Sequence, residues 1–349
     1  MRGCVAPDRT DGPLPLTVAI KALNEQDRIA ETLRHAVAAA RLCGGEVLLA
    51  DSGSDDATVA IARQFPVRIV QLARREDRCC GAGAQLAFQE ARGRYFYLLD
   101  GDMLLDPAFL PAAIAHLEGN PDIAGVGGEL RERAIANSEF AIRAQAAARL
   151  RPQGEAVGHL DGGGLYRRSA VESVGYFADR NLRAFEELDL GWRLRSAGWR
   201  LARIPIHAID HFGHAMPGYA LLWRRLRSGY AGGAGQVARA ALGKPWFPAL
   251  LRGFGHIRNS IVVIFWWCLL AALLLAGAFW PWGAILLILP LAFLLARRRS
   301  LPLACYTFVA WNGIALATIA GFLRPRTPPT LPLAAVTLAE APPLRAEEG

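Results

Sequence analysis

Lysine is nearly absent from the sequence: Lys21 and Lys244 are the only two, and the formal net charge of +8 at pH 7 rests on arginine. No glycine-rich loop with a phosphate-gripping lysine is present, which argues against a P-loop enzyme. The sequence also has no recognisable nucleic-acid-binding motif, and its basic residues alternate with acidic ones before the apolar C-terminal part. We therefore expect no nucleic acid among the partners of this chain.

Two further absences concern cysteine spacing and targeting. None of the 6 cysteines forms a CxxC pair or a spacing suited to zinc, so we expect reduced thiols with packing roles. Residues 1–10 are polar, and no apolar run precedes the first expected strand. The sequence thus shows no signal peptide, and we expect the N-terminal domain to stay in the cytosol.

Long apolar runs are confined to the C-terminal third. Ile261–Phe279 is an uncharged run of about 19 residues, enough to cross a hydrocarbon core as a helix and too long for an ordinary buried helical hairpin. Gly283–Ala296 is shorter and contains Pro290, whereas Leu301–Leu323 is again long. We expect three membrane spans, with two as the alternative because the second run suits a re-entrant segment as well.

Arginines give the expected orientation of this bundle. Arg252 and Arg258 precede it, Arg297–Arg299 lie between the second and third runs, and the Trp280–Trp282 turn is uncharged. By the positive-inside rule the arginines are cytoplasmic, which predicts a multi-pass protein of the inner (cytoplasmic) membrane. The basic cluster Trp223–Arg227 fits membrane lipids or a phosphate-bearing substrate.

Before these runs, strand-like and helix-like segments alternate, which predicts an α/β fold with a mostly parallel sheet and helices on both faces. The expected strands are Leu16–Ile20, Glu46–Ala50, Val67–Val70 and Tyr95–Leu99. Polar residues directly follow three of them. Open α/β sheets bind ligands at the carboxyl ends of their strands, so this edge is the predicted site.

The pair Asp100-Gly101-Asp102 follows the fourth expected strand. Mg²⁺ and Mn²⁺ prefer oxygen ligands, and they commonly take one or two carboxylates together with phosphate oxygens and water. The glycine between the aspartates allows a close backbone approach to a ligand. Taken alone, such a pair is also common in solvated turns, so its surroundings must decide.

Several motifs occur together in one order. They are Asn24-Glu25, the run Asp51–Thr58, Asp100-Gly101-Asp102, and Glu186-Glu187-Leu188-Asp189 with Arg193. In this order they resemble the inverting family 2 glycosyltransferases with the GT-A nucleotide-sugar-binding fold, over about Thr17 to His214. The resemblance implies a GT-A domain followed by an α-helical transmembrane bundle.

The resemblance also implies where a nucleotide-sugar donor binds. Asn24 and Glu25 belong to the first motif, and Glu25 and Asp51 would contact the base and ribose of the nucleotide. A helix-capping role is the structural alternative for Asp51. Arg78 would help to hold the diphosphate, and Gly163 lies in the Gly162–Gly164 loop expected on the acceptor side. An ordinary tight turn is the alternative for that loop.

The acidic group at residues 186–189 would supply the general base. The family places this base second in a Glu-Asp pair, whereas this chain has Glu186-Glu187, so Glu187 is the first candidate. The exchange adds one methylene and leaves Glu186 and Asp189 as alternatives. Asp189 also suits an ion pair with Arg193 one helical turn on.

The metal site implied by the resemblance is Mg²⁺ or Mn²⁺ bound by Asp102, with Asp100 at the metal waters or the ribose. A late histidine often joins it in this fold. We expect His211, then His214, with a plain surface histidine equally compatible with the sequence.

The expected function is sugar transfer to a lipid-linked or glycan acceptor at the inner membrane face. Two alternatives remain: a nucleotidyl- or phosphoryl-transfer enzyme on a similar sheet, and a non-catalytic membrane-anchored scaffold. The expected divisions are residues 1–15 as an extension, 16–215 as the catalytic domain, 216–259 as an amphipathic juxtamembrane region, 260–323 as transmembrane helices and 324–349 as a disordered tail.

Overall fold

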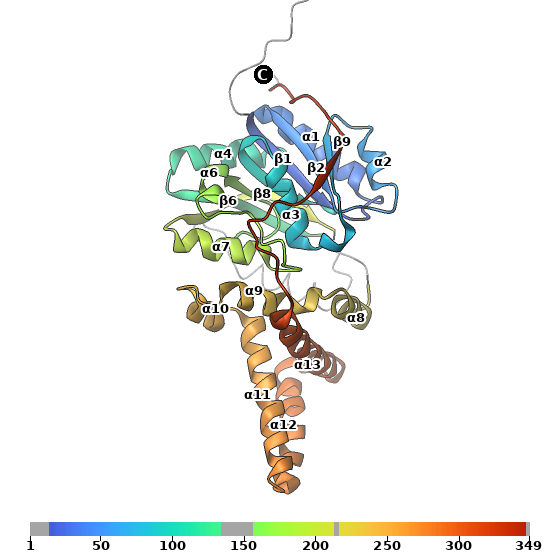
Figure 1. Ribbon diagram of the computed structural model, residues 1–349, viewed down its shortest axis with the longest axis vertical. Helices are drawn as coiled ribbons and strands as arrows, with labels where there is room; N and C mark the ends of the chain where they lie inside the picture. Colours follow the sequence, from blue (N-terminus) through green and yellow to red (C-terminus); the bar gives the residue numbers. More distant parts are fainter. Residues whose placement is uncertain (1–13, 134–155, 213–215, 347–349) are drawn as a thin grey trace, which may run out of the picture.

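A computed structural model describes residues 14–133, 156–212 and 216–346 of the chain. The fold is built on one nine-stranded mixed sheet with the strand order β5-β8-β6-β7-β4-β1-β2-β3-β9. Helices cover both faces of the sheet, and further helices lie below it (Figure 1). The predicted α/β class is confirmed.

The parallel half of the sheet is the half that the sequence predicted. β1 is central there, and it pairs in parallel with β2 on one side and β4 on the other, while β2 pairs in parallel with β3. Leu16, Val18 and Ile20 of β1 are fully buried. The elements are β1 (Leu14–Ala22), α1 (Ile29–Cys43), β2 (Gly45–Asp51), α2 (Thr58–Ala62), β3 (Arg68–Leu72), the 3₁₀ turn η1 (Arg75–Asp77), α3 (Cys80–Glu90) and β4 (Gly93–Asp100).

The other half of the sheet is mixed. β7 lies antiparallel between β4 and β6, and the short β5 pairs antiparallel with β8. These elements are β5 (Met103–Leu105), α4 (Phe109–Gly119), β6 (Ile123–Glu132), β7 (Gly164–Arg167), α6 (Arg168–Glu172), α7 (Glu186–Ser196) and β8 (Arg200–His211). The β5–β8 pair brings Met103 opposite His211, which places the end of β8 beside the turn after β4.

A layer of short helices lies beneath the sheet (Figure 1). It consists of α8 (Gly218–Ser228), η2 (Tyr230–Gly232), α9 (Gly233–Ala241) and α10 (Phe247–Gly253). Trp223 of α8 is exposed, whereas Leu221 and Leu222 are buried, so α8 is amphipathic. This layer occupies the predicted juxtamembrane region.

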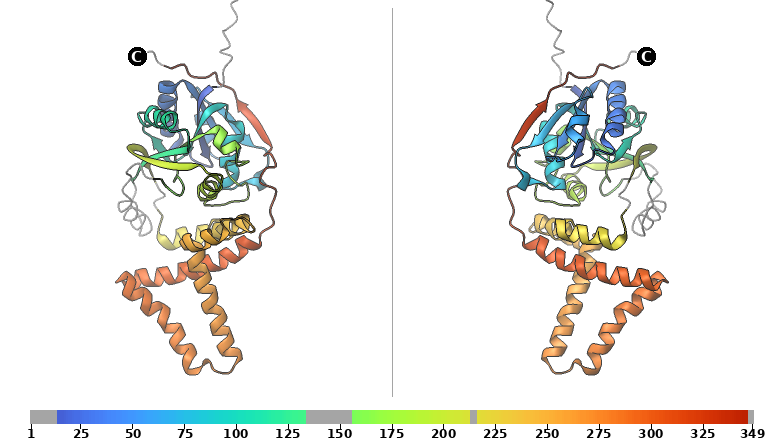
Figure 2. Two further views of the ribbon diagram at one scale, coloured as in Figure 1. Left: turned by 90° about the vertical axis from the view of Figure 1, so that its left-hand side faces the viewer. Right: turned by 90° about the vertical axis from the view of Figure 1, so that its right-hand side faces the viewer.

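Three long helices follow: α11 (Gly255–Leu275), α12 (Phe279–Arg298) and α13 (Leu301–Leu323). Within the described residues, α11 and α13 are long and apolar enough to cross a membrane. The expected second span corresponds to α12, which has extended backbone at Trp280, contains Pro290 and ends in Arg297 and Arg298, and its crossing stays a prediction. Figure 2 shows α11 and α12 projecting away from the sheet, and α13 returning beneath it.

α13 packs tightly on the layer of short helices. Building a Cβ at Gly235 of α9 would collide with the backbone carbonyl of Thr318, and a Cβ at Gly321 would collide with that of Gly232. Glycine is therefore required at both positions for the helices to approach this closely. Towards the other end of α13, the Tyr306 ring packs against Tyr219 of α8, with 5.1 Å between centroids.

The prediction of a disordered tail is wrong for residues 324–346, which the structure describes. β9 (Ala335–Ala339) pairs antiparallel with β3 and completes the sheet. On the way there, Arg180 donates a hydrogen bond to the carbonyl of Leu331 at 2.9 Å, and Gln89 Nε2 donates to that of Leu333 at 3.0 Å. The proline-rich composition suggested disorder, but the open edge of β3 supplies the backbone partners that order this segment.

Candidate active site

The predicted site residues meet at the carboxyl edge of the parallel strands. In the register of β1 with its neighbours, Lys21 lies opposite Asp100 and Ala22 lies opposite Asp51. The loops that follow these three strands therefore leave the sheet side by side.

The loops after β1 and β2 are hydrogen-bonded to each other. Asn24 N–H donates to Ser54 Oγ at 2.9 Å, Asp55 N–H donates to Asn24 Oδ1 at 2.8 Å, and Glu25 N–H donates to Thr58 Oγ1 at 2.8 Å. Asn24 has a left-handed φ of 59°, which asparagine tolerates better than most residues. The two motifs that the sequence separated by about 25 residues thus form one surface.

Asp51 organises the loop that follows it. Its fully buried carboxylate accepts hydrogen bonds from Gly53 N–H at 2.8 Å and Ser54 N–H at 2.9 Å, and from Gln71 Nε2 at 2.7 Å. These bonds are those of a turn-forming aspartate. Arg78 donates to the Gly53 carbonyl, so it supports the same loop from outside.

Glu25 lies against the aspartate pair. A Cβ at Gly101 would meet the Glu25 side chain at 2.6 Å, so the glycine is what allows this approach. Burial and the neighbouring charges of Asp102 and Asp100 raise the pKa of Glu25 to about 7. Three acidic side chains thus crowd a small volume, an arrangement that a bound cation relieves.

Lys21 is the residue that the sequence reasoning missed. Its Nζ lies 2.7 Å from Glu186 Oε1, 3.2 Å from Asp100 Oδ1 and 4.0 Å from Glu187 Oε1. Burial opposes its charge, but the attraction of the three carboxylates outweighs burial and raises the pKa of Lys21. Lys21 stands three residues before Asn24, near the end of a buried strand, and that position was the available signal.

The acidic group at the start of α7 divides into three environments. The Glu186 side chain is 3% exposed and is held by Lys21 at 2.7 Å, whereas that of Glu187 is 21% exposed and lies 4.0 Å from Lys21. Burial and the charge of Glu186 raise the pKa of Glu187 to about 8. Asp189 differs: its Oδ2 accepts from Arg193 Nε at 2.8 Å, and both side chains are buried.

That ion pair argues against Asp189 as the general base. Arg193 also donates to the carbonyls of Tyr176 at 2.5 Å and Phe177 at 2.8 Å, so the pair ties α7 to the preceding segment. A buried carboxylate fixed in this way lacks the freedom to take a proton from a substrate. Asp189 therefore has the structural role that its spacing to Arg193 suggested.

Phe185 precedes this helix in a left-handed conformation, with φ of 68°. A bulky residue is rarely found there, and such strain concentrates at functional sites. Its ring packs against Phe254, with 4.9 Å between centroids, and against His256 at the start of α11, with 5.2 Å. The start of α7 is therefore in direct contact with the first long helix.

On the other side of the aspartate pair, His211 contacts Asp102. Its Nε2 lies 3.5 Å from Asp102 Oδ2, and its Nδ1 lies 2.6 Å from Glu132 Oε2. Burial lowers the pKa of His211, but hydrogen bonds with both carboxylates outweigh burial and raise it to about 9. Glu132 at the end of β6 is a second residue that the sequence did not single out, and His214 lies outside the described residues.

These residues fit a divalent cation only with help from a ligand. Across residues 14–133, 156–212 and 216–346, no three His, Cys, Asp or Glu side chains are arranged to hold a metal ion. Mg²⁺ and Mn²⁺ commonly bind one or two protein carboxylates and complete their shell with phosphate oxygens and water. Asp102 and His211, with Glu132 orienting the imidazole, form such a partial donor set.

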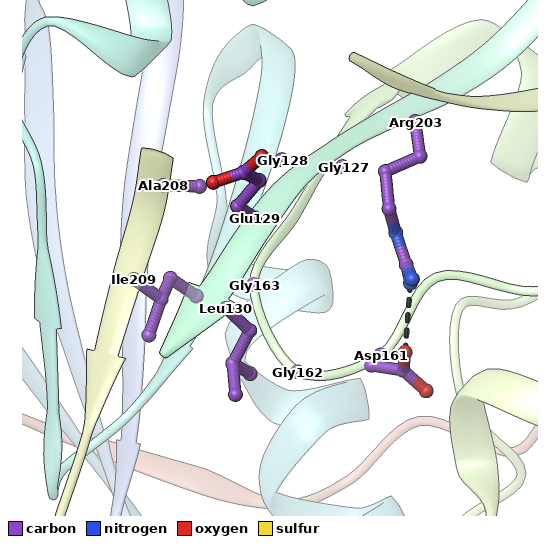
Figure 3. A pocket seen from close by; sticks show the side chains of 10 residues that line it. All are labelled: Gly127, Gly128, Glu129, Leu130, Asp161, Gly162, Gly163, Arg203, Ala208 and Ile209. Carbon is purple, nitrogen blue, oxygen red and sulfur yellow. Dashed lines mark hydrogen bonds and ion pairs between the residues drawn. The ribbon is translucent and has the colours of Figure 1, made fainter. Parts of the chain in front are cut away.

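Gly163 lies at the wall of a small cavity (Figure 3). It has φ of 86°, and a Cβ there would collide with Ile209 and with the Tyr97 hydroxyl. The cavity is about 10 Å³, room for one water molecule, and Arg203 closes it by an ion pair with Asp161 at 2.7 Å. Close packing against Ile209 and Tyr97 thus explains why a glycine is needed at position 163. A contact of Gly163 with a ligand stays a prediction.

Comparison with known sequences identifies the domain. Residues 17–175 match the model of glycosyl transferase family 2. The chain is 33% identical over 114 residues to a dodecaprenyl-phosphate galacturonate synthase of Rhizobium johnstonii, covering 30% of this chain and 33% of the relative. It is 28% identical over 167 residues to the putative glycosyltransferase EpsE of Bacillus subtilis, covering 44% and 58%. The matched regions thus span less than two thirds of either relative.

Comparison with solved structures confirms the fold. The mannosyltransferase PcManGT from Pyrobaculum calidifontis, solved in complex with GDP-Man and Mn²⁺, superposes with a TM-score of 0.60 at 23% identity. The superposition covers 91% of this chain and 89% of that structure, so the likeness includes the helices after the sheet.

Proposed function

Because the chain contains a glycosyl transferase family 2 domain with the GT-A fold, we propose that it is an inverting glycosyltransferase with a nucleoside-diphosphate sugar as donor. One observation carries this proposal. Glu187 lies beside the Lys21–Asp100–Glu186 cluster at the strand ends, next to the loops that hold Asp51 and Glu25. This places a carboxylate with a raised pKa at the edge where the donor is expected.

The division of roles follows from the ion pairs. Lys21 engages Glu186 and Asp100 closely, so these two carboxylates are compensated in the protein. Glu187 is more distant from Lys21 and more exposed, which leaves it able to accept a proton from the attacking acceptor oxygen. Inversion needs a single base on the side opposite the leaving diphosphate, and Glu187 is the best-placed candidate.

On the donor side, Asn24, Glu25 and Asp51 would shape the pocket for the nucleotide. Asp102 and His211, with Asp100 nearby, would hold a divalent cation, which supplies positive charge for the departing diphosphate. The raised pKa of His211 means that a proton must leave the imidazole before it becomes a ligand. Arg78 would act indirectly, by supporting the Gly53 loop.

We propose a lipid-linked acceptor at the inner membrane face. The R. johnstonii relative is named a dodecaprenyl-phosphate galacturonate synthase, a name that contains a lipid phosphate. In this chain, Phe185 connects the base-bearing α7 to the start of α11, so a membrane-embedded acceptor would be presented close to Glu187. A water-soluble acceptor would not require this placement.

The chain path supports an even number of membrane crossings. β9 pairs with β3 of the catalytic sheet, so the chain must return after α13 to the side from which α11 departed. Because α13 packs along the short-helix layer, we propose that α11 enters the membrane, α12 returns, and α13 lies near the interface (Figure 2). Arg252 before α11 and Arg258 in its first turn argue for a cytoplasmic catalytic domain.

A donor screen tests the proposed function. The purified full-length chain would be incubated in detergent with single nucleotide sugars, a polyprenyl phosphate and Mn²⁺ or Mg²⁺, and release of nucleoside diphosphate would be measured. One donor should give metal-dependent release together with a lipid-linked product of inverted anomeric configuration. A product that retains the donor's configuration would contradict the single-base mechanism.

A further inference from the structure

A second cavity, about 150 Å³ in volume, lies where the catalytic domain meets the end of α13. Its walls come from four parts of the chain: the turn after β3, the segment before α7, α9, and the chain that leaves α13. Typical pockets for small-molecule ligands are about 300–1,000 Å³, so this one suits a small group rather than a nucleotide sugar.

The cavity is strongly basic. The lining side chains include five arginines but two carboxylates, which belong to Glu76 and Asp77; the arginines are Arg78, Arg180, Arg183, Arg324 and Arg326. Of these, Arg180 is paired with Asp77 at 2.9 Å, Arg78 with Asp55 at 3.8 Å, and Arg326 with Asp179. The positive charge of the wall thus exceeds what the protein compensates.

The excess charge is concentrated on Arg183 and Arg324. Arg183 Nη1 donates to the carbonyl of Ser228 at 2.6 Å, and neither arginine has a carboxylate within ion-pair distance in the described part of the chain. Both flank Gly229: a Cβ there would lie 3.2 Å from Arg183 Cδ and 3.5 Å from Arg324 Nη1. Burial and the charge of Arg324 lower the pKa of Arg183. Two like charges held together in this way favour an anion between them.

The position of Arg324 indicates the source of that anion. It directly follows Leu323, the last and strongly exposed residue of the apolar helix α13. Basic residues at this point of a membrane-associated helix lie at the depth of lipid headgroups. Guanidinium groups bind phosphate by paired hydrogen bonds, which matches two arginines that lack acidic partners.

We propose that the cavity between Arg183 and Arg324 binds the phosphate of a membrane lipid headgroup. The site is separate from the proposed donor and acceptor chemistry, because Glu187, Asp102 and His211 do not line it. Arg78 lines it and also donates to the Gly53 carbonyl, so an occupant would touch the far side of the donor loop.

The test is lipid retention by the full-length protein in detergent, followed by native mass spectrometry. Phosphatidic acid is the probe, and diacylglycerol, which has the same acyl chains without the phosphate, is the matched lipid. Arg183→Gln/Arg324→Gln is compared with Arg34→Gln/Arg41→Gln, which removes the same charge from the exposed face of α1. The first pair should weaken phosphatidic acid binding about 30-fold.

The proposal requires that the wild type and the α1 control variant retain phosphatidic acid and that the Arg183→Gln/Arg324→Gln variant loses it. None of the three proteins should retain diacylglycerol. Equal loss in both double variants would show a general charge effect and overturn it. Displacement of the lipid by inorganic phosphate at the same concentration would overturn the headgroup as the source. Melting temperature and nucleoside-diphosphate binding should stay as in the wild type; if the double variant fails to fold, Arg324→Gln alone replaces it.

Discussion

Replacing Glu187 by glutamine separates the proposed base from the structural carboxylate next to it. Glu187→Gln keeps the side-chain volume and removes the proton acceptor, and a positioned general base contributes typically about 10²–10⁴-fold to the rate, or about 3–5 kcal/mol of barrier. Glu187 lies 4.0 Å from Lys21 and its pKa is raised to about 8, so the fold loses no strong ion pair. We expect transfer to fall by that factor with unfolding free energy unchanged or slightly higher.

Glu186→Gln should behave in the opposite way. The Glu186 carboxylate is 3% exposed and lies 2.7 Å from Lys21 Nζ. Removing one partner of a buried ion pair costs up to about 3–5 kcal/mol, and here the cost is reduced because Lys21 Nζ keeps Asp100 Oδ1 at 3.2 Å. This variant should therefore unfold at lower denaturant concentration, whatever its activity.

The assay pairs three measurements on both variants: sugar transfer to the lipid acceptor, nucleoside-diphosphate affinity by calorimetry, and chemical unfolding in detergent. Nucleotide affinity in Glu187→Gln should stay within a few-fold of the wild type, since the proposed donor contacts lie on other loops. Normal transfer by Glu187→Gln would refute the assignment of the base. Normal transfer by both variants would remove the acidic start of α7 from the mechanism altogether.

Three further predictions concern the metal, pH and topology. Asp102→Asn should abolish transfer while the exposed Asp27→Asn does not, and full activity in excess chelator would contradict a metal-dependent reaction. Because the base must be deprotonated, the transfer rate of the wild type should rise with pH through about 8. The residual transfer rate of Glu187→Gln should show no such rise. A reporter fused after Gly349 should be found on the same side as the catalytic domain; signal from the opposite side would refute the even number of crossings that β9 requires.

The sequence was sufficient where local pattern and ligand chemistry coincide. The four expected strands correspond to β1 to β4, and the aspartate pair lies at the turn after β4, because short apolar runs followed by polar turns favour buried strands. The motif order also predicted the GT-A fold. These inferences needed only residues close in sequence and the rule that parallel strands end at a common edge.

What the sequence could not predict depends on pairings over long distances. Lys21 and Glu186 are 165 positions apart, so nothing local indicates their ion pair. Glu132 becomes relevant only because β6 and β8 run side by side and bring it to His211. The proline-rich composition around β9 suggested a disordered tail, and the strand forms because β3 offers an open edge.

The pairing of β9 with β3 has a consequence for biosynthesis. A ribosome makes β1 to β8 first, then the long apolar helices, and only afterwards the strand that closes the sheet edge beside β3. Until β9 is made, the backbone groups on the outer edge of β3 have no strand partner, and this edge can pair with other chains. The sheet can therefore be completed only after the long helices have been synthesised, so a chain cut short within them would carry the candidate site but lack the last strand of its sheet.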